Sequence, residues 1–278
     1  MAEFVWETLQ LLPFLFVTYL VLEAVEAHAG GALGGFLERA RSVGPAAGAL
    51  AGAIPQCGVS AAAASFYAGG AISVGTLLAV FLSTSDELVP VLLSERVPVG
   101  LLARIVGVKC ICAVAVGFTA NGVLSFMRHI RREVSVRELC EHSRCGCHRH
   151  NGILLPAFIH TLEIFVFIAA ISGAIELCLR YFGEDCLLRL RLTTPILGEV
   201  VAGALGLIPN CAVSVAGAKL YLAGAISPGA LMASSFTSAG VGLLVLFRTN
   251  RNMRENIAIL VSVYAVGVVL GALCGPLI

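Results

Sequence analysis

The chain has 278 residues, of which 58% are hydrophobic and 13% are charged, and its formal net charge is +1. Because a soluble domain carries about 25% charged residues, this composition excludes an ordinary soluble protein. It predicts an all-α, polytopic membrane protein, and the near-neutral charge gives no reason to expect nucleic acid as a partner.

The first apolar run covers residues 4–26, and a membrane-spanning helix needs roughly 20 such residues. No basic segment precedes it, so we expect it to stay as a membrane helix rather than to be cleaved as a signal peptide. Residues 45–70 form a second run with Pro55 in its middle, and proline breaks a helix. We therefore expect two half-helices that meet at residues 54–58.

A third run, residues 72–93, is interrupted by the polar stretch STSDE at residues 83–87. Residues 97–127 complete the first half, and their Arg104 and Lys109 are expected to snorkel to the membrane surface or to neutralise acids. Apolar runs then recur in the same order after a polar linker. The sequence thus predicts a first membrane repeat at 1–127, a linker at 128–152 and a second membrane repeat at 153–278.

A direct duplication supports this division. Residues 54–79 and 208–233 match at 15 of 26 positions with a constant offset of 154 and no gaps. The matches include Pro55 with Pro209 and Cys57 with Cys211, which apolar composition alone would not align. Internal duplication in an apolar chain is typical of transporters built from repeats.

The distribution of basic residues separates two topologies. With four full crossings in each half, nine basic residues lie on one side of the membrane and six on the other. With the Pro-Cys stretch as a re-entrant hairpin, each half has three crossings, and the split becomes eleven to four. The positive-inside rule favours the second topology. It predicts two inverted repeats with broken or re-entrant helices, a cytoplasmic linker, and both termini outside.

The two Pro-Cys breaks are the first candidate site. Each break offers an amide and a thiol: Gln56 and Cys57 in one copy, Asn210 and Cys211 in the other. Backbone that is not helical is tolerated in a bilayer only where it lines a cavity or is buried in protein. We expect these four side chains to meet and to bind a metal cation. The alternative is that proline only kinks the helix and cysteine only packs.

The polar stretch at residues 83–87 is the second candidate site. Ser83, Ser85, Asp86 and Glu87 stand inside an apolar run, where acids are costly and are functional by default. We expect them to bind the substrate, with Asp86 as a metal ligand beside the four side chains of the Pro-Cys breaks. The alternative is that the membrane ends near Leu82 and that the acids are interfacial.

Two further groups carry ionisable side chains. Intramembrane acids also suit proton coupling, and we assign that role to Glu23, Glu163 and Glu176. The linker is dense in possible metal ligands, although their spacing is not that of a zinc finger. We interpret it as an accessory metal-collecting loop, with a merely polar loop as the alternative. Its ligands are Cys140, His142, Cys145, Cys147, His148 and His150.

Residues 52–94, which include IPQCGVSAAAASFYAGGAISVGTLLAVFLSTSDELVPVLLS at residues 54–94, resemble the ten-transmembrane heavy-metal exporter family. Members of that family are also labelled manganese transporters or arsenic-efflux-like proteins. The resemblance extends over nearly the whole chain, and the second copy fits the family's weaker repeat. It implies metal or metalloid efflux across the bacterial inner membrane, and it favours Pro55, Gln56, Cys57 and the second candidate site.

We expect a secondary transporter that exports a divalent, manganese-like transition-metal cation by proton antiport. No nucleotide-binding GxxxxGK[ST] motif is present. One alternative is an efflux permease for a trivalent arsenical or another small solute. Another is a membrane-embedded metal-dependent enzyme that uses His160, Glu163 and Asp86, although no HExxH motif occurs. The expected partners are the cation, protons and the lipid bilayer, with no cofactor; a homo-oligomer is an open alternative.

Overall fold

A computed structural model describes residues 33–54, 57–85, 88–127, 196–209 and 211–278 of the chain. It also describes a few isolated positions in two other apolar runs, among them Phe16 and Phe158. Within these residues the architecture is all-helical and contains no β-sheet, which confirms the all-α part of the predicted fold class.

The described helices fall into two groups of five. The first group is α2 (Leu33–Gly52), α3 (Cys57–Ala68), α4 (Val74–Ser83), α5 (Leu88–Ser94) and α6 (Val99–Met127). The second group is α10 (Leu197–Gly206), α11 (Cys211–Leu222), α12 (Pro228–Thr237), α13 (Val241–Thr249) and α14 (Met253–Cys274), followed by the 3₁₀ turn η3 (Gly275–Leu277).

The offset of 154 that relates the sequence copies also relates the helix ends. The helices α3 and α11 begin and end at positions 154 apart, and so do α4 and α12. The caps agree as well, because Ser73 and Ser227 each accept a hydrogen bond from a backbone N–H in the first turn of the helix that follows. Gly70 and Gly224 precede these caps with positive φ, which glycine adopts without strain.

Four helical segments are long and apolar enough to cross a membrane. They are Val74–Ser94, Val99–Leu124, Pro228–Thr249 and Met253–Leu277. The first and third are interrupted, at the α4–α5 and α12–α13 junctions, and are 75% and 78% buried inside the protein. The second and fourth, formed by α6 and α14, are continuous and only 17% and 28% buried. The interrupted spans therefore lie inside, and the continuous spans present most of their surface outward.

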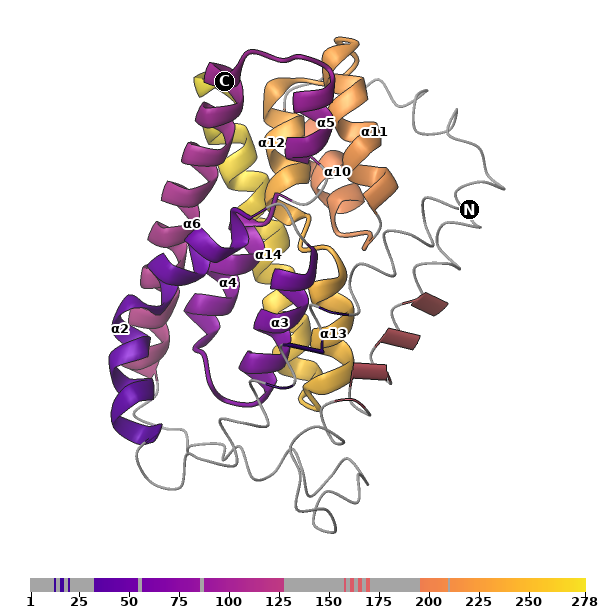
Figure 1. Ribbon diagram of the computed structural model, residues 1–278. Helices are drawn as coiled ribbons and strands as arrows, with labels where there is room; N and C mark the ends of the chain where they lie inside the picture. The colour runs from indigo at the N-terminus through magenta and orange to yellow at the C-terminus, as the bar shows by residue number, and fades with distance from the viewer. Residues whose placement is uncertain are drawn as a thin grey trace.

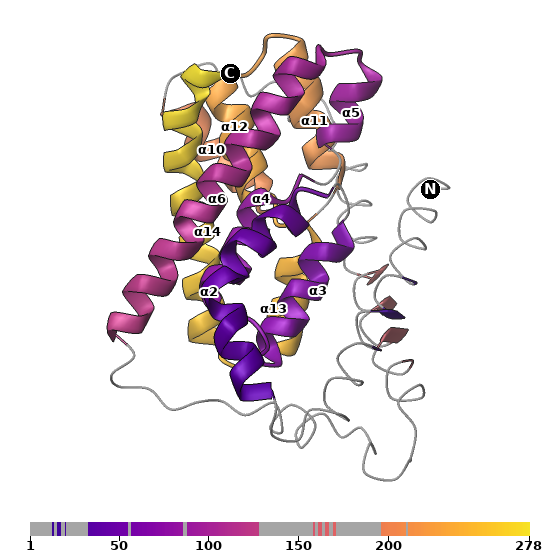
Figure 2. The same ribbon diagram turned by 60° about the vertical axis from the view of Figure 1, so that its left-hand side comes forward.

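The two halves are interleaved rather than side by side. Helix α3 of the first half packs along α13 of the second, and α11 of the second half contacts α5 of the first. In Figures 1 and 2, α4 leads up to α5, whereas α12 leads down to α13, so the two interrupted spans run in opposite directions. Their broken ends therefore lie at a similar height in the middle of the molecule.

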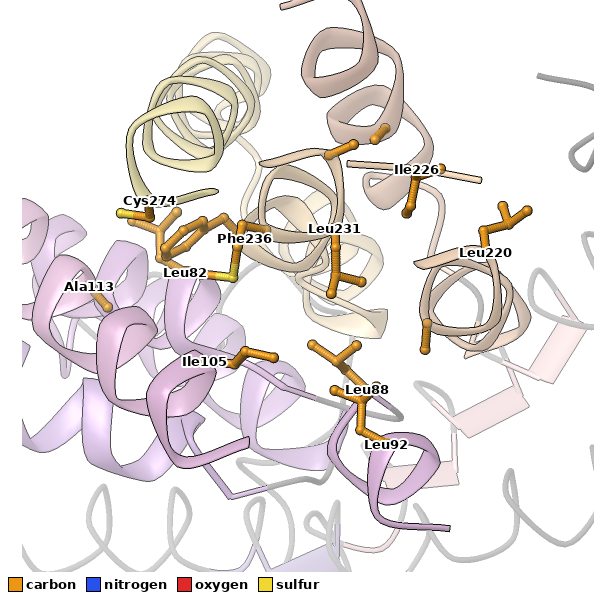
Figure 3. Packing of buried hydrophobic residues seen from close by; sticks show 14 of the residues in the cluster. Leu82, Leu88, Leu92, Ile105, Ala113, Leu220, Ile226, Leu231, Phe236 and Cys274 are labelled. Atoms are coloured by element: carbon orange, nitrogen blue, oxygen red, sulfur yellow. The ribbon is translucent and has the colours of Figure 1, made fainter. Parts of the chain in front are cut away.

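Small residues allow the helices before and within each interrupted span to approach closely. A Cβ added to Gly52 of α2 would overlap Ser83 Oγ and lie 2.6 Å from the carbonyl oxygen of Val80. A Cβ added to Gly206 of α10 would overlap Thr237 Oγ1 in the corresponding way. A shared apolar cluster, which includes Leu82 and Ile105 of the first half and Leu231 and Phe236 of the second, then joins the halves (Figure 3).

Candidate functional site

The C-terminal ends of α4 and α12 form the polar centre of the molecule. Helix α4 ends with Thr84 as its C-cap, and α12 ends with Ser238, which stands at the same position of the repeat. The last turn of a helix leaves carbonyl groups without intrahelical partners, and its end carries a partial negative charge. Two such ends inside the protein create a region that attracts a cation.

Hydroxyl groups surround these ends. In α4, Thr84 Oγ1 donates to the carbonyl oxygen of Val80 at 2.7 Å, and Ser83 Oγ donates to the same oxygen at 3.0 Å. Ser83, Thr84 and Ser85 are all at most 2% exposed. In the second half, Ser214 Oγ of α11 lies 3.1 Å from Ser238 Oγ. The buried hydroxyls thus have partners, as the burial of polar groups requires.

A small cavity opens between the two broken ends. Its volume is about 10 Å³, which is about the room that one water molecule needs. All of its polar lining side chains are hydroxyls, and they come from both halves of the chain. The lining residues are Thr84, Ser85, Leu88, Ser214, Gly217, Leu231, Ser234, Ser235 and Ser238. A site of this size and composition suits a single small ion held by hard oxygen donors.

Lys109 of α6 connects the two ends beside this cavity. Its Nζ donates to the carbonyl oxygen of Thr84, to the carbonyl oxygen of Ser235 at 2.8 Å and to Ser235 Oγ at 2.6 Å. The side chain is fully buried and lies 5.9 Å from the centre of the Phe236 ring. The expectation that Lys109 snorkels to the membrane surface is therefore wrong, whereas the alternative that it neutralises acids stays a prediction. Its ammonium group is held by the broken-helix ends of both halves, which carry the opposite partial charge.

The structure describes only some of the residues of the predicted site. Ser85 lines the cavity, and Ser83, which precedes the lining residue Thr84, is buried but is not part of the lining. Helices α3 and α11 begin at Cys57 and Cys211, but the side chains of these cysteines are outside the description. The other predicted residues lie outside the described residues: Gln56, Asp86, Glu87, Asn210, Glu23, Glu163, Glu176, His160, Cys140, His142, Cys145, Cys147, His148 and His150.

The interruptions themselves are where the sequence predicts them. Helix α2 ends at Gly52 and α3 starts at Cys57, on either side of Pro55, and α4 ends at Ser83. The sequence analysis missed the serines of α11 and α12 that line the cavity, and it did not predict that Lys109 is fully buried. The signals that point to them are modest: a lone lysine deep in an apolar helix and the adjacent pair Ser234 and Ser235.

Glu199 of α10 is a buried acid that lies outside the lining of the cavity. It is 6% exposed in the first turn of α10, and Ser227 Oγ donates to its Oε1 at 3.1 Å. Since Ser227 caps the N-terminus of α12, the carboxylate stands at the positive end of that helix. Its role is to stabilise the start of the interrupted span rather than to line the cavity.

Among the described residues, no group of three or more His, Cys, Asp or Glu side chains is placed to hold a metal ion. The cation site that these residues offer is therefore one of hydroxyl and carbonyl oxygens.

The four candidate membrane spans are those of a multi-pass membrane protein. The family model described as "Putative, 10TM heavy-metal exporter" matches residues 7–193, which is more than half of the chain. The chain belongs to this heavy-metal exporter family, as the resemblance predicts, and the family is one of transporters rather than enzymes. No curated protein and no solved structure matched the chain.

Proposed function

We propose that this chain is a secondary transporter of the bacterial inner membrane that exports a divalent, manganese-like cation in exchange for protons. The observation that carries the proposal is the cavity between the broken ends of α4 and α12. Its polar lining consists of hydroxyls, and the sequence places the carboxylates of Asp86 and Glu87 directly after the lining residue Ser85. Hydroxyl, carbonyl and carboxylate oxygens are the ligands that Mn²⁺ and similar hard cations prefer.

The balance of charge supports a divalent cargo. Lys109 contributes one positive charge beside the cavity, and Asp86 and Glu87 contribute two negative charges at the adjoining break. The pair of acids therefore outweighs the lysine and leaves a net attraction for a dication. Because charges inside a membrane protein are weakly screened, the loss of one carboxylate removes that attraction.

We also propose that the two halves are inverted repeats that move by alternating access. The common offset of the helix ends and the opposite directions of the two interrupted spans support this arrangement. In transporters of this type, the substrate site lies where discontinuous helices of the two repeats meet, and one repeat rocks against the other. The domain boundaries at residues 127 and 153 and a cytoplasmic linker are part of the proposal.

The other predicted residues keep their roles within the proposal. Gln56, Cys57, Asn210 and Cys211 are ligands from the second pair of breaks. Glu23, Glu163 and Glu176 carry the protons that exchange for the cation. The Cys/His-rich linker collects metal on the cytoplasmic side before transport.

Everted membrane vesicles test the cargo and the coupling together. Vesicles that contain the protein should accumulate Mn²⁺, and a pH-sensitive dye should report proton movement in the opposite direction. Zn²⁺, Cd²⁺ and Mg²⁺ are assayed in parallel, and vesicles without the protein give the background. Uptake without proton movement would reject antiport, and the absence of Mn²⁺ uptake would reject the proposed cargo.

A neutral trivalent arsenical is the second candidate cargo, and the hydroxyl lining of the cavity is the observation that favours it. Serine and threonine hydroxyls both donate and accept hydrogen bonds, so their chemistry matches a hydroxylated neutral solute, although the cavity of about 10 Å³ has the size of a single small ion. Asp86→Asn separates the candidates. It should abolish export of a dication, which needs the carboxylate, and leave export of a neutral arsenical nearly unchanged.

A further inference from the structure

A pair of thiols lies outside the hydroxyl-lined cavity, where two helices from different halves of the chain meet. Cys112 Sγ of α6 lies 3.7 Å from Cys274 Sγ at the end of α14. Cys274 is 6% exposed and sits at the edge of the shared apolar cluster, as Figure 3 shows. Both cysteines are free.

We propose that Cys112 and Cys274 form a binding site for a soft or borderline divalent cation such as Cd²⁺ or Zn²⁺. The separation of the sulfur atoms fits this role. Two thiolates bound to one tetrahedral zinc ion at about 2.3 Å each lie about 3.8 Å apart. The pair can therefore hold a shared ion with little movement of the helices, and thiolate sulfur selects softer cations than the oxygens of the cavity do.

The charge of the complex selects a divalent ion. Binding proceeds by loss of both thiol protons to water, so that two thiolates and one M²⁺ give a complex with no net charge. An uncharged complex avoids most of the cost of burying an ion in apolar surroundings. A monovalent cation would leave one negative charge in the apolar cluster. Among the described residues no third His, Cys, Asp or Glu joins the pair, so water would complete the coordination.

The internal duplication shows that packing at these positions does not require sulfur. The positions of the repeat that correspond to Cys112 and Cys274 hold Val266 and Ala120, at the same offset of 154. Each half thus fills one of these positions with an ordinary apolar side chain. Each half carries one cysteine of the pair, and the two cysteines stand at different positions of the repeat.

Cadmium binding tests the site in a chain that keeps Cys112 and Cys274 and has its other eight of ten cysteines replaced by alanine. Titration with Cd²⁺ should produce the cadmium–thiolate charge-transfer absorption, with saturation at one ion per chain. Excess Mn²⁺ should not remove it, because Mn²⁺ binds thiolates poorly. The matched control keeps Cys110 and Cys274 instead. Cys110 lies on the same helix, but its Sγ contacts the carbonyl oxygen of Ala49 at 3.8 Å, so the absorption should be absent.

Equal absorption in both chains, or none in the Cys112/Cys274 chain, would overturn the proposal. If the loss of eight cysteines prevents folding, single variants of the otherwise native chain give the answer. Cys112→Ala should bind one Cd²⁺ fewer than the native protein, whereas Cys110→Ala should bind the same number. The same number of ions in all three proteins would also overturn the site.

A bound ion would tie α6 to α14 and so restrict movement between the halves. Cd²⁺ should therefore inhibit Mn²⁺ transport by the native protein and should inhibit Cys112→Ala at least tenfold less strongly. This arm rests on the proposed function, whereas the absorption measurement does not. Cadmium absorption without Mn²⁺ transport would uphold the thiol site and reject the transport proposal, so the two failures are distinguishable.

Discussion

Lys109 is the residue through which the two broken ends are held together. Its three described hydrogen bonds reach Thr84 in one half and Ser235 in the other, and its side chain has no exposed surface. Hydrogen bonds to a charged group stabilise a fold more than neutral ones do. The lysine therefore has a structural effect that can be measured apart from transport.

Replacement of Lys109 by methionine should lower the stability of the protein. The change keeps the apolar stem but leaves buried oxygens without their charged donor, at a cost of roughly 1.5–3 kcal/mol. The unfolding midpoint in detergent solution should fall by several degrees. Lys219→Met is the matched control, since Lys219 of α11 is exposed; an equal fall in both variants would show that Lys109 does not hold the ends together.

At the scale of the element, the close approach of α2 to α4 and of α10 to α12 fixes where the interrupted spans end. These contacts depend on Gly52 and Gly206, which face the last turns of α4 and α12. Any larger side chain would push the broken end and its hydroxyl groups away from the position that they now occupy. The shape of the cavity is thus set by helix packing as well as by its lining residues.

Gly52→Ala and Gly206→Ala should each destabilise the protein by about 1–3 kcal/mol, the usual cost of overpacking. Gly107→Ala is the control, because a Cβ at this position of α6 meets nothing within 4 Å. Alanine should be neutral or slightly stabilising there. Thermal unfolding of the three purified variants makes the comparison; a Gly206→Ala midpoint equal to that of Gly107→Ala would contradict the packing argument.

The interruptions could be predicted from the sequence because their causes are local. Pro55 breaks one helix, and the STSDE stretch marks the end of another. The packing of α3 against α13 is not a local property. The pattern of apolar residues in α3 does not show whether its neighbouring helix comes from the first or the second half of the chain. The same holds for Lys109, which has apolar residues on all sides of its helix, so that the sequence alone does not distinguish an inward from an outward position.

At the scale of the whole molecule, each interrupted span packs against a helix of the other repeat. Helix α3 packs along α13, and α11 contacts α5. A rigid movement of one repeat would therefore carry along helices that pack against the broken span of the other. This is the physical basis on which the proposed alternating access depends, and it requires the halves to have opposite orientations in the membrane.

Single cysteines on two exposed turns test the proposed orientation. Arg96 follows α5 and Arg251 precedes α14, and the proposal puts Arg96 outside and Arg251 in the cytoplasm. In intact cells a membrane-impermeant maleimide should label Arg96→Cys and not Arg251→Cys, both made in a chain without other cysteines. In everted vesicles the pattern should reverse; labelling of both positions from one side would exclude inverted repeats.

The double variant Ser214→Ala with Ser235→Ala removes two hydroxyls from the lining of the cavity. Its rate of Mn²⁺ transport tests most directly whether the cation passes between the broken ends of α4 and α12. Each hydroxyl contributes about 1 kcal/mol of hydrogen bonding, so we predict a fall of at least about tenfold. The control is Thr119→Ala with Ser262→Ala, which removes two exposed hydroxyls that bond to their own helices and should transport at the native rate. A cavity variant that transports as fast as this control would contradict the claim that the cation passes between the broken ends of α4 and α12.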